Sequence, residues 1–364
     1  MIQNEKNLSP SIAYDVHAIG NPEELLFFDI ETTGLSVYRS SLYLIGYLYY
    51  DPSSSVWVSG QIFCESLADE ADALKAFSRH LHENTILVSY NGDSFDLPFL
   101  KHMAAQYSIP LFSENQKSVD LLKLFRPLKK ILHLENLKLK TCERALSIDR
   151  EDPYSGKELI EMYARWQENR DPELLRILLL HNREDIENLP RILPLLHYRF
   201  LEQTEKTLLF QEVIASANGH AETLTLCYET GLSLPFPWEK QTETYRLHWE
   251  KCMIRLEVSL YAGELRYFYP DVENYYYLPA EDMAVHRSLA SFVDAKHRKK
   301  ATPKTCYQRQ EGIFIPQPED ILQPVFLKEY KSADRFSLYR GQDLPAEDAV
   351  RYVNAVLHAL LHEK

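Results

Sequence analysis

A short apolar run near the N-terminus ends in two carboxylates that stand two residues apart. Residues 25–28 are all apolar, and Asp29, Ile30 and Glu31 follow before a Thr-Thr-Gly stop. A short run without a polar face predicts a buried β-strand. Because side chains alternate along a strand, Asp29 and Glu31 lie on the same side. Two neighbouring anions at a buried strand end repel each other and are costly to desolvate. They therefore indicate a site for a divalent cation, which prefers carboxylate oxygens.

Length and composition are those of a globular protein with about two domains. The chain has 364 residues, of which 45% are hydrophobic, enough for about two ordinary domains. The longest apolar stretch, 42–50, is too short to cross a bilayer, and residues 1–15 lack a signal-peptide pattern. The scattered cysteines form no Cys-x-x-Cys pair, which disfavours a disulfide framework and a zinc site. We therefore expect a cytoplasmic protein without a membrane partner, whose oligomeric state is open.

The charge distribution is uneven. A net charge of −13 disfavours a polyanionic partner, yet two segments carry the opposite charge. Residues 117–150 contain nine bases and four acids, and residues 295–310 contain six bases and no acid. A solvated helix face and a phosphate-binding groove both explain such segments. The tyrosines at 267–277 can likewise pack a sheet face or stack unpaired bases.

The order of predicted elements favours an α/β layer arrangement. After the first strand we expect a hairpin of strands at 42–50 and 56–63, a helix at 67–82, a strand at 85–90 and a further helix at 97–107. Asp96 is predicted as the N-cap of the last of these helices, with Pro98 in its first turn. Helices then dominate 121–199. This order predicts a mixed sheet flanked by helices.

Beyond residue 200 the pattern changes to antiparallel strands. We predict strands at 224–234, 245–261 and 264–269, a turn at 261–264, and a closing amphipathic helix at 346–362. We therefore expect an N-terminal extension at 1–21, an α/β domain at 22–200 and a smaller α+β domain of unknown role at 201–364.

Two further carboxylates stand where they can join the first pair. Asp96 directly follows a strand, and His181 and Asp185 are four residues apart, so both project from one helix face. Phosphodiester cleavage by two divalent ions about 3.5–4 Å apart uses several carboxylates, and a nearby histidine can activate the water. Asp93 and Asp120 are alternative candidates for the place of Asp96 among these acids, although Asp93 suits a turn and Asp120 suits a structural role.

Three motifs in this order resemble the DEDD superfamily of 3′→5′ exonucleases. They are Asp29-x-Glu31, Asn91-x-x-x-Phe95-Asp96 and His181-x-x-x-Asp185. The segments Ser118-Val119-Asp120-Leu121-Leu122, Leu134-Glu135-Asn136-Leu137 and His181-Asn182-x-x-Asp185 look most like the YprB-type branch. The resemblance covers about residues 22–200. It implies a ribonuclease-H-like fold, two Mg²⁺ or Mn²⁺ ions, and a DNA or RNA substrate with a single-stranded 3′ end.

The resemblance also implies roles for individual residues. The implied metal ligands are Asp29, Glu31, Asp96 and Asp185, and the activating group is His181. The implied substrate contacts are Thr32, Asn91, Phe95 and Asn182. One departure concerns spacing: the histidine branch of the superfamily has its histidine five residues before the last aspartate, where this chain has Leu180. His181 stands at the spacing of the tyrosine branch, so a packing role for it stays open. A nucleic-acid-binding protein that keeps the scaffold without cutting is the alternative function.

Overall fold

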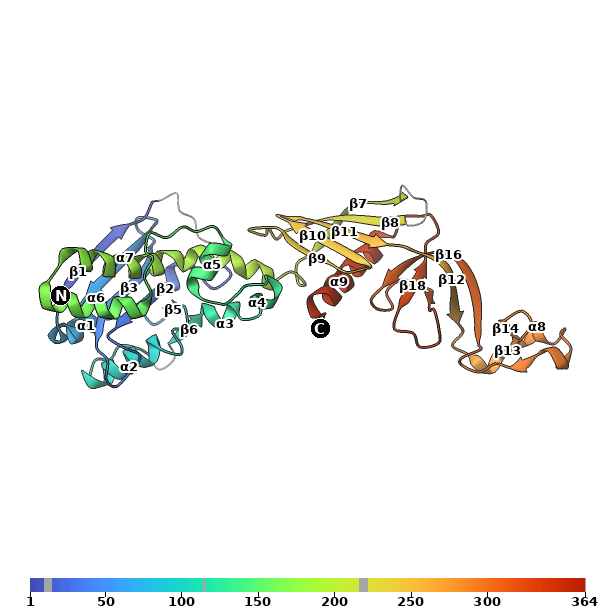
Figure 1. The fold of residues 1–364 in the computed structure, drawn as a ribbon, viewed down its shortest axis with the longest axis horizontal. Coiled ribbons are helices and arrows are strands. Elements are labelled where there is room, and N and C mark those ends of the chain that lie inside the picture. The colour runs from blue at the N-terminus through green and yellow to red at the C-terminus, as the bar shows by residue number, and fades with distance from the viewer. Residues whose placement is uncertain (10–14, 114–115, 216–221, 364) are drawn as a thin grey trace. The chain divides into compact units, whose positions relative to one another are not determined.

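The chain divides into two compact units, each described here by itself (Figure 1). The computed structural model describes residues 1–9, 15–113, 116–215 and 222–363. Unit 1 is Met1–Arg199 and unit 2 is Phe200–Lys364.

Unit 1 is built on a six-stranded mixed sheet with the strand order β1-β4-β3-β2-β5-β6. The strands are β1 (Ile2–Asn7), β2 (Leu25–Thr32), β3 (Leu42–Asp51), β4 (Val56–Phe63), β5 (Ile86–Ser89) and β6 (Lys117–Asp120). The first four are antiparallel neighbours, whereas β2, β5 and β6 run parallel. The predicted mixed α/β sheet is confirmed. The segment predicted as an N-terminal extension contains an edge strand of this sheet, β1.

Helices pack on both faces of this sheet. On one face, Phe28 and Ile30 of β2 join a core with α1 (Glu70–Ser78) and α2 (Asp96–Gln106). On the other face, Tyr43 and Phe63 pack against two longer helices, which are α6 (Gly156–Asn169) and α7 (Pro172–Asn188). Because side chains alternate along β2, the carboxylates on either side of Ile30 face α7. Between α2 and α6 the chain forms the short helices α3 (Leu121–Phe125), α4 (Leu128–Ile131) and α5 (Leu139–Ala145), and the 3₁₀ segment Pro190–Arg199 follows α7.

Unit 2 contains three antiparallel sheets. The first has the order β7-β8-β11-β10-β9 and consists of β7 (Lys206–Ala215), β8 (Glu222–Thr230), β9 (Trp238–Gln241), β10 (Tyr245–Glu250) and β11 (Met253–Ser259). The second has the order β12-β16-β18-β17 and consists of β12 (Tyr261–Phe268), β16 (Tyr307–Gln317), β17 (Val325–Phe326) and β18 (Arg335–Leu338). The third has the order β14-β13-β15 and consists of β13 (Tyr275–Leu278), β14 (Met283–His286) and β15 (Lys299–Lys300). The closing helix, α9 (Ala346–His362), has the predicted bounds.

Two predictions for unit 2 were wrong. The single strand predicted at 245–261 is a hairpin, because Lys251 adopts a positive φ of 50° and turns the chain between β10 and β11. The turn predicted at 261–264 lies inside β12, where Gly263 pairs with Gly312 of β16. Strands β1, β6, β7, β9 and β13 to β18 were not predicted. Among the described residues, no helix has the length and apolar character needed to cross a membrane.

Candidate acidic metal centre

The end of β2 carries the first two acids of the site. Asp29 and Glu31 are half-buried, on the strand face that packs against α7. Burial raises the pKa of both carboxyl groups well above their usual range, and repulsion from Asp96 and Asp185 raises the pKa of each further. The pair therefore sits in a field of like charge, as the strand pattern predicted.

Asp96 joins the pair from the start of α2. It is the first residue of the helix and Phe95 is the N-cap, so the predicted N-cap role of Asp96 was wrong. The Asp96 carboxylate instead accepts the backbone N–H of Ile30 at 3.1 Å, between the two β2 acids. Burial raises the pKa of Asp96 to about 7, against the lowering effect of the Ile30 and Asp96 backbone N–H groups. This hydrogen bond fixes one carboxylate oxygen beside the strand end.

Helix α7 brings the remaining acid across the sheet, and a glycine makes room for it. Gly46 of β3 pairs with Asp29, and a Cβ at Gly46 would overlap the side chains of Asn182 and Ile186. The missing side chain lets α7 lie close to the sheet. The fully buried Asn182 then donates from Nδ2 to Asp29 Oδ2 at 3.1 Å, and its Oδ1 accepts from Gln61 Nε2 at 3.0 Å. Asn182 thus holds Asp29 and has no exposed surface for a substrate.

His181 faces the acids with one ring nitrogen and a buried aspartate with the other. Its Nε2 lies 3.6 Å from Glu31 Oε1 and 3.5 Å from Asp185 Oδ2. Its Nδ1 lies 2.6 Å from Oδ2 of Asp152, which is 4% exposed. A carboxylate that accepts the Nδ1 hydrogen leaves Nε2 of the neutral ring able to take a proton. Asp152 therefore contacts the His181 ring at Nδ1, and the sequence analysis missed this contact because Asp152 lies 29 residues before the histidine.

Arg150 holds Asp185 from the other side. Its Nη1 lies 2.6 Å from Asp185 Oδ1 and 3.0 Å from Glu143 Oε1, and its side chain is 7% exposed. Burial alone would lower the pKa of Arg150, but the charges of Asp185 and Glu143 raise it. The guanidinium leaves Asp185 Oδ2 facing His181. No spacing in the sequence links residue 150 to residue 185, so this contact was also missed.

The other predicted site residues lie at the edge of this cluster or in the protein interior. The Thr32 side chain is buried, and its hydroxyl donates to the Gly34 carbonyl at 2.8 Å. Asn91 is exposed with a positive φ of 69°, and Phe95 is half-buried against Phe99. Asn91 and Phe95 are therefore the two predicted substrate contacts with accessible surface.

The two rival acids have structural partners. Asp93 pairs with Lys123 at 2.5 Å and accepts the Ser118 hydroxyl. Asp120 caps α3 by accepting the Leu122 N–H at 3.0 Å, and also accepts the Asn91 N–H at 2.8 Å. Its second oxygen is buried without a hydrogen-bond partner, and its charge adds to the raised pKa of Asp96. Asp120 therefore supports the loop before Asp96, while Asp93 lies in a different ion pair.

The donor set suits a hard divalent cation. Four carboxylates meet here from β2, α2 and α7, and ligand atoms of Glu31, His181 and Asp185 lie within 4.8 Å of one another. A cation would relieve the repulsion that raises the carboxyl pKa values. A second group of this kind, Glu202 with His358 and His362, lies on the surface of unit 2.

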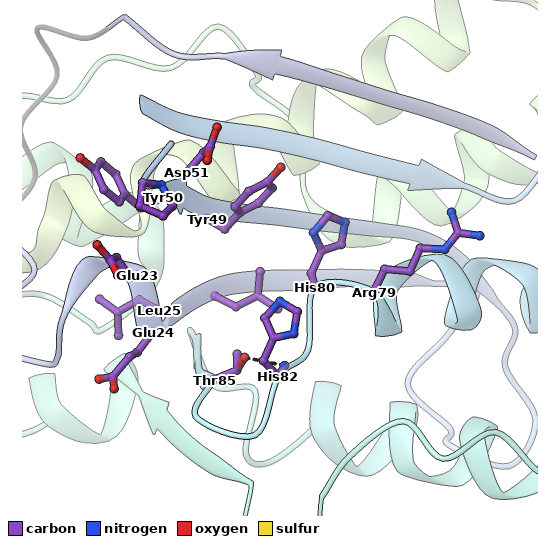
Figure 2. Close-up of a pocket in the computed structure, with 12 residues that line it drawn as sticks. Glu23, Glu24, Leu25, Tyr49, Tyr50, Asp51, Arg79, His80, His82 and Thr85 are labelled. Atoms are coloured by element: carbon purple, nitrogen blue, oxygen red, sulfur yellow. Dashed lines mark hydrogen bonds between the residues drawn. The ribbon is translucent and has the colours of Figure 1, made fainter. Parts of the chain in front are cut away.

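Figure 2 shows a pocket at the opposite end of β2, lined by Leu25, Tyr49 and His80 among others. Its volume is about 430 Å³. None of the acids described above lines it, so it is separate from the acidic centre.

The family match to known proteins lies within unit 1. Residues 26–197 match a family model described as the RNase_H superfamily. A search of curated proteins found no match. Three solved structures are similar over part of the chain. Exonuclease I is 13% identical over 56% of this chain and 55% of its own, with a TM-score of 0.32. NrnC of Brucella melitensis bound to pGG is 19% identical over 50% of this chain and 74% of its own, with a TM-score of 0.33. The Nibbler EXO domain of Aedes aegypti is 14% identical over 49% and 79%, with a TM-score of 0.32.

This chain thus spans about half the length of exonuclease I. Identities and TM-scores this low transfer no activity to this chain. The family match and the mixed sheet agree with the prediction of the fold. Residues 26–197 match the model of the RNase H superfamily on a ribonuclease-H-like fold, and the YprB-type branch stays a prediction.

Proposed function

We propose that unit 1 is a divalent-metal-dependent nuclease that removes nucleotides from single-stranded 3′ ends. The observation that carries the proposal is the meeting of Asp29, Glu31, Asp96 and Asp185, with the carboxyl pKa values of the first three raised by burial. Such a cluster costs the protein stability unless a cation neutralises it. We infer that the two units are separate domains, with the nuclease site in the first.

The four acids are the proposed ligands of two Mg²⁺ or Mn²⁺ ions. When bound, such ions polarise the scissile phosphate and stabilise the attacking and departing oxygens. The protein supplies the positions of the ligands: the Ile30 N–H holds Asp96, Asn182 holds Asp29, and Arg150 holds Asp185. These three acids are thus fixed before a substrate arrives, which saves reorganisation during the reaction.

His181 is the proposed acceptor of the proton from the attacking water. Its Nε2 faces the cluster between Glu31 and Asp185, while Asp152 orients the ring through Nδ1. This arrangement follows the general-base pattern in which a carboxylate fixes the tautomer of a histidine. The unusual spacing of His181 is compatible with this role, because the i and i+4 positions put both side chains on one face of α7.

The preference for a single-stranded end follows from burial. Asp29 and Glu31 are half-buried and Asp96 is 6% exposed, so the scissile phosphate must enter a recess. A terminal nucleotide enters such a recess more easily than an internal nucleotide of a duplex. The choice between DNA and RNA is left to the experiment.

The test is digestion of 5′-labelled oligonucleotides, DNA and RNA, single- and double-stranded, with and without Mn²⁺. We expect a ladder that shortens from the 3′ end and requires the metal. Asp29→Asn should lower the rate by more than about 100-fold. Removing a residue that only supports a metal ligand lowers activity by about 10–100-fold, so a larger loss is expected for a ligand itself. The matched control Asp93→Asn should change the rate by less than about 2-fold, because Asp93 belongs to another ion pair.

A non-cleaving nucleic-acid-binding protein is the second candidate function. It is favoured by one contact, the 2.6 Å ion pair through which Arg150 already neutralises one oxygen of Asp185. Binding of the oligonucleotides without cleavage in Mg²⁺ or Mn²⁺ would select this candidate and overturn the nuclease proposal.

A further inference from the structure

The small sheet β14-β13-β15 of unit 2 carries an unusual local charge. It packs with the short helix α8 (Arg287–Ala290), and β13, β14 and α8 lie together beyond β12 and β16 (Figure 1). Residues 283–310 contain seven Lys or Arg side chains and a single acid, Asp294, in a chain whose net charge is −13. Positive charge is therefore concentrated on the segment that contains β14, α8 and β15, whereas residues 271–282 around β13 contain four acids and no Lys or Arg.

Four lysines of this segment are exposed, namely Lys296, Lys299, Lys300 and Lys304. Within the part of the chain that the structure describes, none of them forms an ion pair. Lys299 and Lys300 form β15, one of the two edge strands of the sheet. Their side chains lie on opposite faces of the sheet, because neighbouring residues alternate along a strand. An extended polyanion that follows this edge can thus contact both lysines.

Aromatic side chains accompany the lysines. Tyr276 pairs with Lys300 across the strands, so the two side chains share one face of the sheet. The Arg298 guanidinium lies 5.2 Å from the Tyr276 ring centroid and also donates to the Ala290 carbonyl. This arginine therefore ties α8 to the tyrosine face.

Two apolar side chains next to these groups are exposed to solvent. Phe292 is 88% exposed and Leu289 is 62% exposed. Exposing a large aromatic ring so fully brings no packing benefit, and such rings serve as stacking platforms for unpaired bases. We call this region the basic edge surface, and it consists of Tyr276, Leu289, Phe292, Lys296, Lys299, Lys300 and Lys304.

We propose that the basic edge surface binds single-stranded nucleic acid, with phosphates on the lysines and bases on Phe292 and Tyr276. Free cations next to flat aromatic rings are the combination that such strands require. The identity of the ligand as the substrate of unit 1 rests on the proposed nuclease function, whereas the binding itself does not. With four free lysines and only two exposed apolar side chains, the surface favours a polyanionic strand over insertion into a lipid bilayer.

The direct test measures binding by fluorescence anisotropy, with the full chain, a labelled 30-nucleotide strand and EDTA. Replacing the four lysines by glutamine should raise the Kd on the order of 100-fold at 100 mM salt and reduce the slope of log K against log salt by about 3. Phe292→Ala should raise the Kd by about 5-fold or more. The control variant K75Q/K157Q/K251Q/K331Q makes the same charge change at four exposed lysines elsewhere and should leave the Kd within about 3-fold.

Binding in EDTA requires no cleavage, so this test fails separately from the nuclease proposal. Equal Kd values for the two quadruple variants would overturn the basic edge surface, and so would preferential binding to anionic lipid vesicles. If the K296Q/K299Q/K300Q/K304Q protein aggregates while its affinity for the strand is unchanged, the lysines protect the sheet edge from pairing with other chains. That result would also overturn the proposal that the basic edge surface binds nucleic acid. If unit 1 cleaves, this variant should lose activity on the 30-nucleotide strand and keep it on a dinucleotide.

Discussion

Asp96→Asn should stabilise the metal-free protein, and the gain should grow with pH. Asp96 is buried among like charges, and its carboxylate accepts the Ile30 N–H at 3.1 Å. Asparagine keeps an oxygen that can accept this hydrogen bond and removes the charge. The substitution therefore removes a destabilising feature while it removes a proposed metal ligand.

The magnitude follows from the pKa of Asp96, about 7 in the folded protein against 3.8 for the free side chain. Below pH 3.8 the carboxyl is protonated in both states and contributes nothing. Between these values the unfolded chain releases the proton and the folded protein retains it, so wild-type stability falls as pH rises. Above pH 7 the cost levels off at roughly 4 kcal/mol, at about 1.4 kcal/mol per pKa unit.

Urea unfolding of the full chain in EDTA at pH 5, 6.5 and 8 measures this effect. The free energy of unfolding of Asp96→Asn minus that of wild type should increase by roughly 2.5 kcal/mol between pH 5 and pH 8. The control Asp93→Asn should instead lower the free energy of unfolding by a nearly constant amount between pH 5 and pH 8, because this carboxyl is ionised in the folded and unfolded states over that range. Although burial alone would raise the pKa of Asp93, Lys123 and Ser118 lower it, so its charge stabilises the fold.

If the difference in free energy of unfolding between Asp96→Asn and wild type stays constant with pH, the reasoning is refuted, because the charge of Asp96 would then cost no stability. Lower stability of Asp96→Asn at pH 8 would refute it as well. Adding Mn²⁺ should narrow the difference at pH 8, since a ligand that binds only the folded state stabilises wild type by about 2.7 kcal/mol at 100 times its Kd.

Two further predictions concern the support of the site. Gly46→Ala should lower the free energy of unfolding by about 1–3 kcal/mol in urea, because the new Cβ overlaps Asn182. Gly156→Ala, where no atom lies within 4 Å of the new Cβ, is the control, and equal effects of both would contradict the close approach of α7. Asp152→Asn should lower kcat by about 10–100-fold and alter the pH profile, with oligonucleotide binding in EDTA unchanged. Asp149→Asn, three residues earlier and exposed, should have neither effect, and an unaltered pH profile for Asp152→Asn would remove its role in orienting His181.

Local patterns accounted for most elements of unit 1 and for one half of the site. Strand β2 agrees with the prediction because it begins with an unbroken apolar run, and β3, β4 and the helix α9 agree because their periodicity is continuous over eight or more residues. Strand β6 escaped prediction since its residues Lys117–Asp120 are mostly polar, and only pairing with β5 makes them a strand. The turn predicted at 261–264 failed for the related reason that a glycine in a paired strand resembles a glycine in a turn.

What the chain determines by itself is which side chains share one element: Asp29 with Glu31 on a strand, and His181 with Asp185 on a helix. Alternation and the helical repeat are local geometry, so they need no knowledge of the fold. Only the tertiary structure decides that Asp96 lies against Ile30, that Asp152 orients His181, and that Arg150 holds Asp185. Those contacts join residues 29 to 66 positions apart, and packing between separate elements, rather than any repeat along the chain, brings them together.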